Sequence, residues 1–162
     1  MKTIILFLFL SLNLFAQSPL LTLFSSDEAV NLIPNSTFDN NDYWGTVIHF
    51  TIHDGVASFD GVAGGQLLLT DLANTTYYPI AWEVGATYRI TYTISNTTDA
   101  KIGFFDNTAS VAYVGYENKT NGTYIEEFVY SSGEGGLNIF ASIYTGSSFD
   151  IDNVFLIKIA NP

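Results

Sequence analysis

The chain has 162 residues, a formal net charge of −11 at pH 7 and no cysteine. A charge of this sign argues against nucleic acid and anionic membrane surfaces as partners, and a domain without cysteine must fold without disulfides. The length allows one domain with a substantial core and not two.

Residues 1–16 are typical of a secretory signal peptide. Lys2 precedes an apolar run from Ile4 to Phe15, and the small residue Ala16 follows it. Because this run is too short to span a bilayer comfortably, we expect cleavage near Ala16 and a secreted or cell-surface protein without a membrane attachment. A retained N-terminal anchor is the alternative. Residues 17–30 are expected to be a lead-in segment, which could form a short strand or pack on the outside of the domain.

Residues 31–160 carry the alternating pattern of β-strands. From Thr87 to Ile94 the sequence alternates strictly, so its apolar residues would share one face of a strand and its polar residues the other. Runs at 111–116, 124–130 and 137–144 are similarly rich in β-branched and aromatic residues, which favour strands.

Turn signals separate these runs. The strongest is Asn121-Gly122, because both residues tolerate positive φ, and it predicts a hairpin. No stretch beyond the signal peptide has a convincing helical period. Many short strands between turns predict an all-β sandwich or barrel.

Two motifs near the ends of this region are more specific. The first is Asn31-Leu-Ile-Pro-Asn-Ser-Thr-Phe-Asp39, followed by Trp44, and the second is Phe149-Asp-Ile-Asp-Asn-Val-Phe-Leu156. Together they resemble the opening and closing motifs of the jelly-roll carbohydrate-binding modules of families 4, 9 and 22, which belong to the galactose-binding-like group. The resemblance covers about residues 31–158. It implies a jelly-roll β-sandwich of two antiparallel sheets, with the first and last segments side by side.

The same resemblance implies a structural calcium ion. In the resembled modules, an acid after the opening Phe and an acid in the closing strand commonly help to hold calcium; here these are Asp39 and Asp152. Calcium takes roughly six to eight oxygen ligands, several of them backbone carbonyls. The alternative is that both acids cap turns or face water.

Aromatic residues are the candidate sugar contacts. Sugars stack their C–H faces on aromatic rings, while their hydroxyls need amide, carboxylate or guanidinium partners. Most aromatic residues, Trp44 and Trp82 included, are expected in the core. Those on polar faces and their polar neighbours are expected to contact glycan, unless a neighbouring chain or loop covers them. These candidates are Gln66, Arg89, Tyr113, Tyr116, Phe140 and Tyr144. Arg89, Phe140, Tyr144 and Gln66 could line one concave sheet, whereas Tyr113 and Tyr116 belong to a strand in which either face is plausible.

Catalysis has little support in the sequence. His49 and His53 lie four residues apart in an expected strand and would share a face, but the spacing offers no third zinc ligand. Glu126 and Glu127 would point to opposite faces of a strand, so they cannot act as an acid–base pair. We therefore expect no catalytic residue and no enzyme activity.

Three functions remain, and the last of them, a small hydrolase, lacks a recognisable set of catalytic residues. The first is a secreted, non-catalytic carbohydrate-binding module that binds polysaccharide or cell-surface glycan. The alternative is a structural or adhesive β-sandwich subunit of a surface assembly, fibre or virion, whose partners would be other proteins or copies of itself. The fold does not decide between them, because one sandwich architecture serves many functions.

Overall fold

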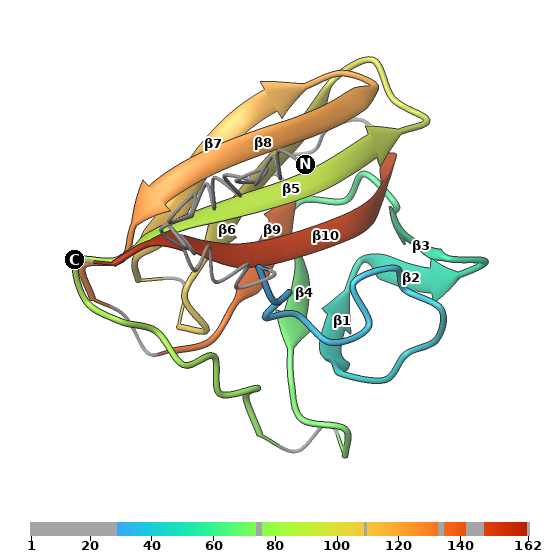
Figure 1. Cartoon of the computed structure of the whole chain (residues 1–162). Helices are drawn as coiled ribbons and strands as arrows, with labels where there is room; N and C mark the ends of the chain where they lie inside the picture. Colours follow the sequence, from blue (N-terminus) through green and yellow to red (C-terminus); the bar gives the residue numbers. More distant parts are fainter. Residues whose placement is uncertain (1–28, 74–75, 109, 133–134, 142–147, 162) are drawn as a thin grey trace, which may run out of the picture.

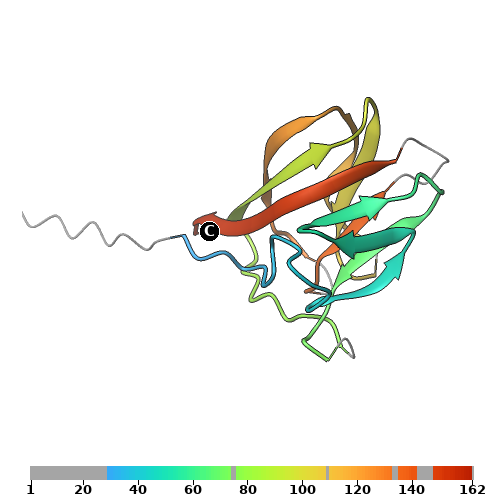
Figure 2. The same ribbon diagram turned by 90° about the vertical axis from the view of Figure 1, so that its right-hand side faces the viewer.

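The computed structural model describes residues 29–161, apart from 74–75, 109, 133–134 and 142–147. These residues form ten strands in two five-stranded sheets that pack face to face (Figures 1 and 2). Every strand pairing is antiparallel. The predicted all-β sandwich of two antiparallel sheets is therefore confirmed. A search of the same residues finds no helix long and apolar enough to cross a membrane.

Each sheet takes strands from both halves of the chain. Sheet A has the order β1 (Trp44–Ile48), β4 (Gly65–Leu69), β9 (Asn138–Ala141), β6 (Ala100–Phe105), β7 (Ala112–Lys119). Sheet B has the order β2 (Phe50–His53), β3 (Val56–Phe59), β10 (Phe149–Ala160), β5 (Thr87–Ser95), β8 (Gly122–Val129). Apart from the consecutive pairs β2–β3 and β6–β7, neighbouring strands are distant in sequence, so most of the packing is long-range.

Strand β5 shows how the alternation builds the core. Tyr88, Ile90, Tyr92 and Ile94 are at most 1% exposed, while the residues between them are half-buried, as the sequence pattern predicts. The Tyr88 hydroxyl accepts a hydrogen bond from the Glu83 backbone N–H at 2.8 Å. Burying one large apolar side chain contributes roughly 1.5–3 kcal/mol, so this one face accounts for a substantial part of the stability.

The opening and closing motifs lie side by side, as predicted. Residues 31–36 run along β10, where the Leu32 N–H donates to the Leu156 carbonyl at 2.7 Å and the Val154 N–H donates to the Ser36 carbonyl at 2.9 Å. The Asn31 side-chain oxygen also accepts the Leu156 N–H at 3.0 Å. The opening segment is therefore fixed to the last strand, although it forms no regular strand itself.

At two sharp turns the chain passes from one sheet to the other, contrary to what the sequence predicts. Asn121-Gly122 does form a turn, but it joins β7 of sheet A to β8 of sheet B, so the predicted hairpin is wrong. His49, with a φ of 59°, lies between β1 of sheet A and β2 of sheet B. His49 and His53 therefore do not share a strand. Local sequence marks such turns but does not tell whether the chain stays in one sheet.

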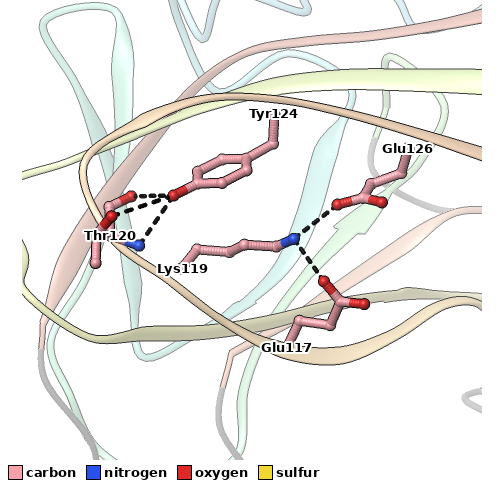
Figure 3. A network of polar contacts seen from close by, with 5 residues as sticks. All are labelled: Glu117, Lys119, Thr120, Tyr124 and Glu126. Carbon is pink, nitrogen blue, oxygen red and sulfur yellow. Dashed lines mark hydrogen bonds and ion pairs between the residues drawn. The ribbon is translucent and has the colours of Figure 1, made fainter.

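An ion network around the largely buried Lys119 side chain crosses from one sheet to the other beside the β7–β8 turn (Figure 3). Lys119 of β7, whose side chain is 10% exposed, places its Nζ 2.5 Å from Glu117 and 2.7 Å from Glu126 of β8. Its ammonium also lies 4.7 Å from the centre of the Tyr124 ring. Burial lowers the pKa of Lys119, but the hydrogen bonds to Glu117 and Glu126 outweigh it and hold the pKa above its ordinary value.

Candidate functional site

The outer face of sheet A carries three neighbouring aromatic side chains, which we call the aromatic platform: Phe105, Tyr116 and Phe140. The Phe105 ring centre lies 5.3 Å from that of Phe140, at an interplanar angle of 74°, and 5.1 Å from that of Tyr116, at 49°. Gly103 lies beneath them, because a Cβ atom there would be 2.7 Å from the Phe105 ring. A side chain at this position would displace that ring.

Cross-strand pairing places polar groups beside the platform. Phe140 is paired with Gln66 of β4 on one side and with Gly103 of β6 on the other. Directly opposite residues in an antiparallel pair project to the same face, so the Gln66 amide lies on the face of the platform. Asn138 of β9 lies opposite Phe105 and is 2% exposed. Among the described residues, its side-chain oxygen has no hydrogen-bond partner, which is unusual for a buried polar atom.

None of the three platform rings belongs to the main core between the sheets. Phe140 is 9% exposed, yet it lies outside the hydrophobic cluster between the sheets. Phe105 and Tyr116 are half-buried. Burial raises the pKa of Tyr116, so its hydroxyl stays protonated at neutral pH and can both donate and accept hydrogen bonds. Phe140 is thus the least exposed member of the platform, whereas the sequence pattern predicts a more exposed ring.

The expectation that Arg89 shares this face is wrong. Arg89 lies on β5 in sheet B, on the opposite side of the sandwich from the platform. Its Nε and Nη2 atoms lie 2.9 Å and 2.6 Å from the same oxygen of Glu127, on β8. The alternation correctly predicts that Arg89 points away from the core. It does not tell which of the two sheets carries Arg89, and each sheet has its own outer face.

Tyr113 is also misplaced by the sequence pattern, because it lies in the core. Its ring stacks on Phe128 at 5.2 Å and 12°, and its hydroxyl donates to the Gly136 carbonyl at 3.2 Å. Burial raises its pKa. The β6–β7 register is irregular around Val114, so Tyr113 and Val114 are both buried although they are consecutive. Tyr144 lies outside the described residues.

Phe105 is a residue that the sequence analysis missed. In β6 it alternates with the buried Ile102 and Phe104 and so shares the polar face with Gly103. The run Lys101-Ile-Gly-Phe-Phe105 contains this alternation, which could have identified Phe105.

Asp39 and Asp152 approach each other where the opening motif meets β10. Burial is the main cause that raises the pKa of Asp152, and the negative charge of Asp39 raises it further. The Asp152 carboxylate accepts the Asn153 backbone N–H at 2.5 Å and its side-chain amide at 2.7 Å. Two approaching carboxylates fit part of the oxygen-rich ligand set of calcium. Within the described residues no three His, Cys, Asp or Glu side chains gather around a point, so carbonyls or water would supply the remaining ligands.

Comparisons with solved structures identify the class of fold. The chain is similar to the second N-terminal cellulose-binding domain of Cellulomonas fimi β-1,4-glucanase C, with a TM-score of 0.56 and 19% identity over 83% of this chain and 98% of that one. A family 4 carbohydrate-binding module aligns with a TM-score of 0.49 and 18% identity over 78% of this chain and 99% of that one. The CBM22-1 xylan-binding domain from Paenibacillus barcinonensis Xyn10C gives 0.48 and 13% over 83% and 97%.

The fold of this chain is thus the jelly roll of carbohydrate-binding modules, as the two end motifs imply. No protein-family model matches the sequence, and no curated protein is significantly similar to it. Identities below a quarter establish the architecture alone, and the same architecture supports many functions.

Proposed function

We propose that the chain is a secreted glycan-binding module without catalytic activity of its own. It binds polysaccharide or cell-surface glycan on the outer face of sheet A, through the aromatic platform and Gln66. The observation that carries this proposal is the platform itself: three touching aromatic side chains outside the main core, with an amide on the same face. The jelly-roll fold, shared with a cellulose-binding domain, supports it.

The chemistry of this face suits an uncharged sugar chain. Aromatic rings offer apolar surface for the C–H faces of sugar rings, and such rings are large contact areas with little conformational freedom to lose. The Gln66 amide and the Tyr116 hydroxyl each both donate and accept hydrogen bonds, as sugar hydroxyls require. Each contact is modest, so we expect dissociation constants between about 1 mM and 1 μM, or roughly −4 to −8 kcal/mol.

Replacing Tyr116 with alanine is expected to weaken binding to soluble polysaccharide about tenfold, which corresponds to about 1.4 kcal/mol. The measurement is affinity electrophoresis against a panel of neutral polysaccharides that includes cellulose derivatives and xylans. Arg89→Ala is the matched control, since it removes a large side chain from the outer face of the other sheet. Melting curves confirm that both variants fold.

Loss of binding in Arg89→Ala with Tyr116→Ala unaffected would move the site to sheet B. A chain that ignores the whole panel but assembles on itself or adheres to other proteins would favour the structural or adhesive alternative. One observation supports that alternative: the edge strand β8 exposes Ile125 and Val129.

We also propose a structural calcium ion held by Asp39 and Asp152. When bound, it would neutralise two carboxylates that otherwise repel each other, and it would tie the opening motif to the last strand. Addition of calcium is expected to raise the stability of the folded chain, by about 2.7 kcal/mol at a calcium concentration 100 times the dissociation constant. The measurement is thermal unfolding with calcium and with chelator.

Asp152→Asn is the variant that tests the calcium proposal. It should remove the calcium-dependent increase in melting temperature, yet it should change the stability of the chelated protein little, because the loss of one hydrogen bond from Asn153 is offset by the removal of a carboxylate disfavoured by burial and by Asp39. Asp54→Asn is the control, since the Asp54 side chain is 98% exposed. Identical melting curves of the unaltered chain with calcium and chelator would refute the proposal.

A further inference from the structure

Strand β8 is a long edge with one side unpaired. It pairs with β5 from Gly122 to Val129 without any register shift, and no described strand pairs with its other side. Figure 1 shows β8 as the outermost strand of sheet B, next to β5. Its outward residues include Ile125, 63% exposed, and Val129, 59% exposed. A free edge with exposed apolar side chains is a template for another strand.

Three of the usual protections of an edge strand, namely proline, lysine and a β-bulge, are missing from β8. Natural edges are often blunted by proline, lysine or a β-bulge. The segment Gly-Thr-Tyr-Ile-Glu-Glu-Phe-Val contains no proline or lysine, and its pairing with β5 is regular. Its backbone is therefore a straight edge of eight residues.

Two copies of the chain repel each other less at this edge than at most other surfaces. The chain carries a net charge of −11, so most surfaces of two copies repel each other. On β8, however, Glu127, the acid on the solvent-facing side, is paired with Arg89, while Glu126 shares Lys119 with Glu117. The charge of Glu127 is thus compensated and that of Glu126 is compensated in part, so the repulsion between two such edges is reduced.

We propose that β8 pairs antiparallel with β8 of a second copy about a two-fold axis, so that two B sheets become one continuous sheet. In a continuous sheet, residues on the solvent-facing side of one strand must lie opposite residues on the same side of the next strand. Two registers then pair nearly the whole strand, one centred on Ile125 and one on Glu126. The second places Glu126 directly opposite itself, and like charges in this position are destabilising. The first places Ile125 opposite Ile125 and Glu127 opposite Thr123, so the dimer takes this register.

Cysteine cross-linking tests the register directly, because the chain has no cysteine of its own. Directly opposite Cβ atoms in an antiparallel pair lie about 4.5–5.5 Å apart, close to the separation that a disulfide spans. Ile125→Cys should therefore form a disulfide dimer on mild oxidation. Val129→Cys is the matched control on the same face of the same strand, since its opposite residue in this register is Asn121. We expect it to cross-link at least about tenfold more slowly.

Sedimentation velocity over a concentration series tests the dimer itself. The unaltered chain should show a monomer–dimer equilibrium, and Ile125→Lys should abolish it by placing two like charges at the axis. Val84→Lys is the control: Val84 is 65% exposed, lies outside the strand, and its replacement changes the net charge equally. The control should dimerise like the unaltered chain.

Several results would overturn this inference. They are a chain that stays monomeric at its highest soluble concentration, a dimer that survives Ile125→Lys, and equal cross-linking through positions 125 and 129. Strong protection from hydrogen exchange, in a monomer, of those β8 amides that point away from β5 would show that another segment of the same chain covers the edge. That result would also exclude the dimer. None of these outcomes depends on whether the chain binds glycan.

Discussion

Replacing Trp44 with alanine is expected to lower the free energy of unfolding by about 3–5 kcal/mol, as for other buried tryptophans. Trp44 is 1% exposed, and its ring centre lies 4.9 Å from that of Phe38 in the opening motif. Its indole N–H donates to the Asn35 carbonyl at 3.0 Å. Alanine would leave a cavity and an unpaired carbonyl, and it would loosen the opening motif from β1.

Urea denaturation monitored by circular dichroism measures this effect. Val47→Ala on the same strand is the control, because Val47 is 39% exposed and its loss should change stability by about 0.5 kcal/mol or less. Trp44→Phe should fall between the two, since it keeps much of the apolar volume but loses the indole donor. Equal effects of Trp44→Ala and Val47→Ala would contradict the assigned role of Trp44.

The second large effect is expected at Glu126, on the strand that also carries Glu127. Glu126→Ala should lower the free energy of unfolding by about 2 kcal/mol, because it removes a charge-assisted hydrogen bond from the buried Lys119 ammonium (Figure 3). Glu127→Ala should cost about 0.5 kcal/mol or less, because its pair with Arg89 is exposed to solvent. The two variants match in chemistry, strand and sequence context.

Salt dependence separates the two glutamates further. An exposed ion pair is screened by added salt, whereas a buried pair is screened much less. The stability difference between the unaltered chain and Glu126→Ala should therefore persist at high salt, while that for Glu127→Ala should vanish. Equal losses at both positions would mean that the Lys119 network does not hold the two sheets together.

Much of the fold follows from short-range patterns in the sequence. The strict alternation from Thr87 to Ile94 predicts which residues of β5 are buried, because a strand has only two faces and one of them must meet the core. The motifs around Asn31 and Phe149 predict that the two ends lie together. These inferences need only local periodicity and a resemblance that extends over most of the chain.

The candidate site could be predicted only in part. The pattern correctly places Gln66 and Phe140 away from the main core, and the structure brings them together with Tyr116, whose face the pattern leaves open. It could not predict that Arg89 belongs to the other sheet, because alternation distinguishes the faces of a strand but not the partners of that strand. Nor could it predict that Tyr113 is buried, because an irregular register in β7 interrupts the period of two.

The position of β10 has a consequence for the order in which the chain can fold. It lies between β3 and β5 in sheet B, and residues 31–36 hydrogen-bond to it, yet it is the last strand in the sequence. Before β10 is in place, β2 and β3 have no connection to β5 and β8. Contacts between residues so distant in sequence form slowly, because a long loop must close before they contribute. Until β10 has been synthesised, a growing chain would therefore leave the edges of β3 and β5 unpaired and exposed to solvent and to chaperones.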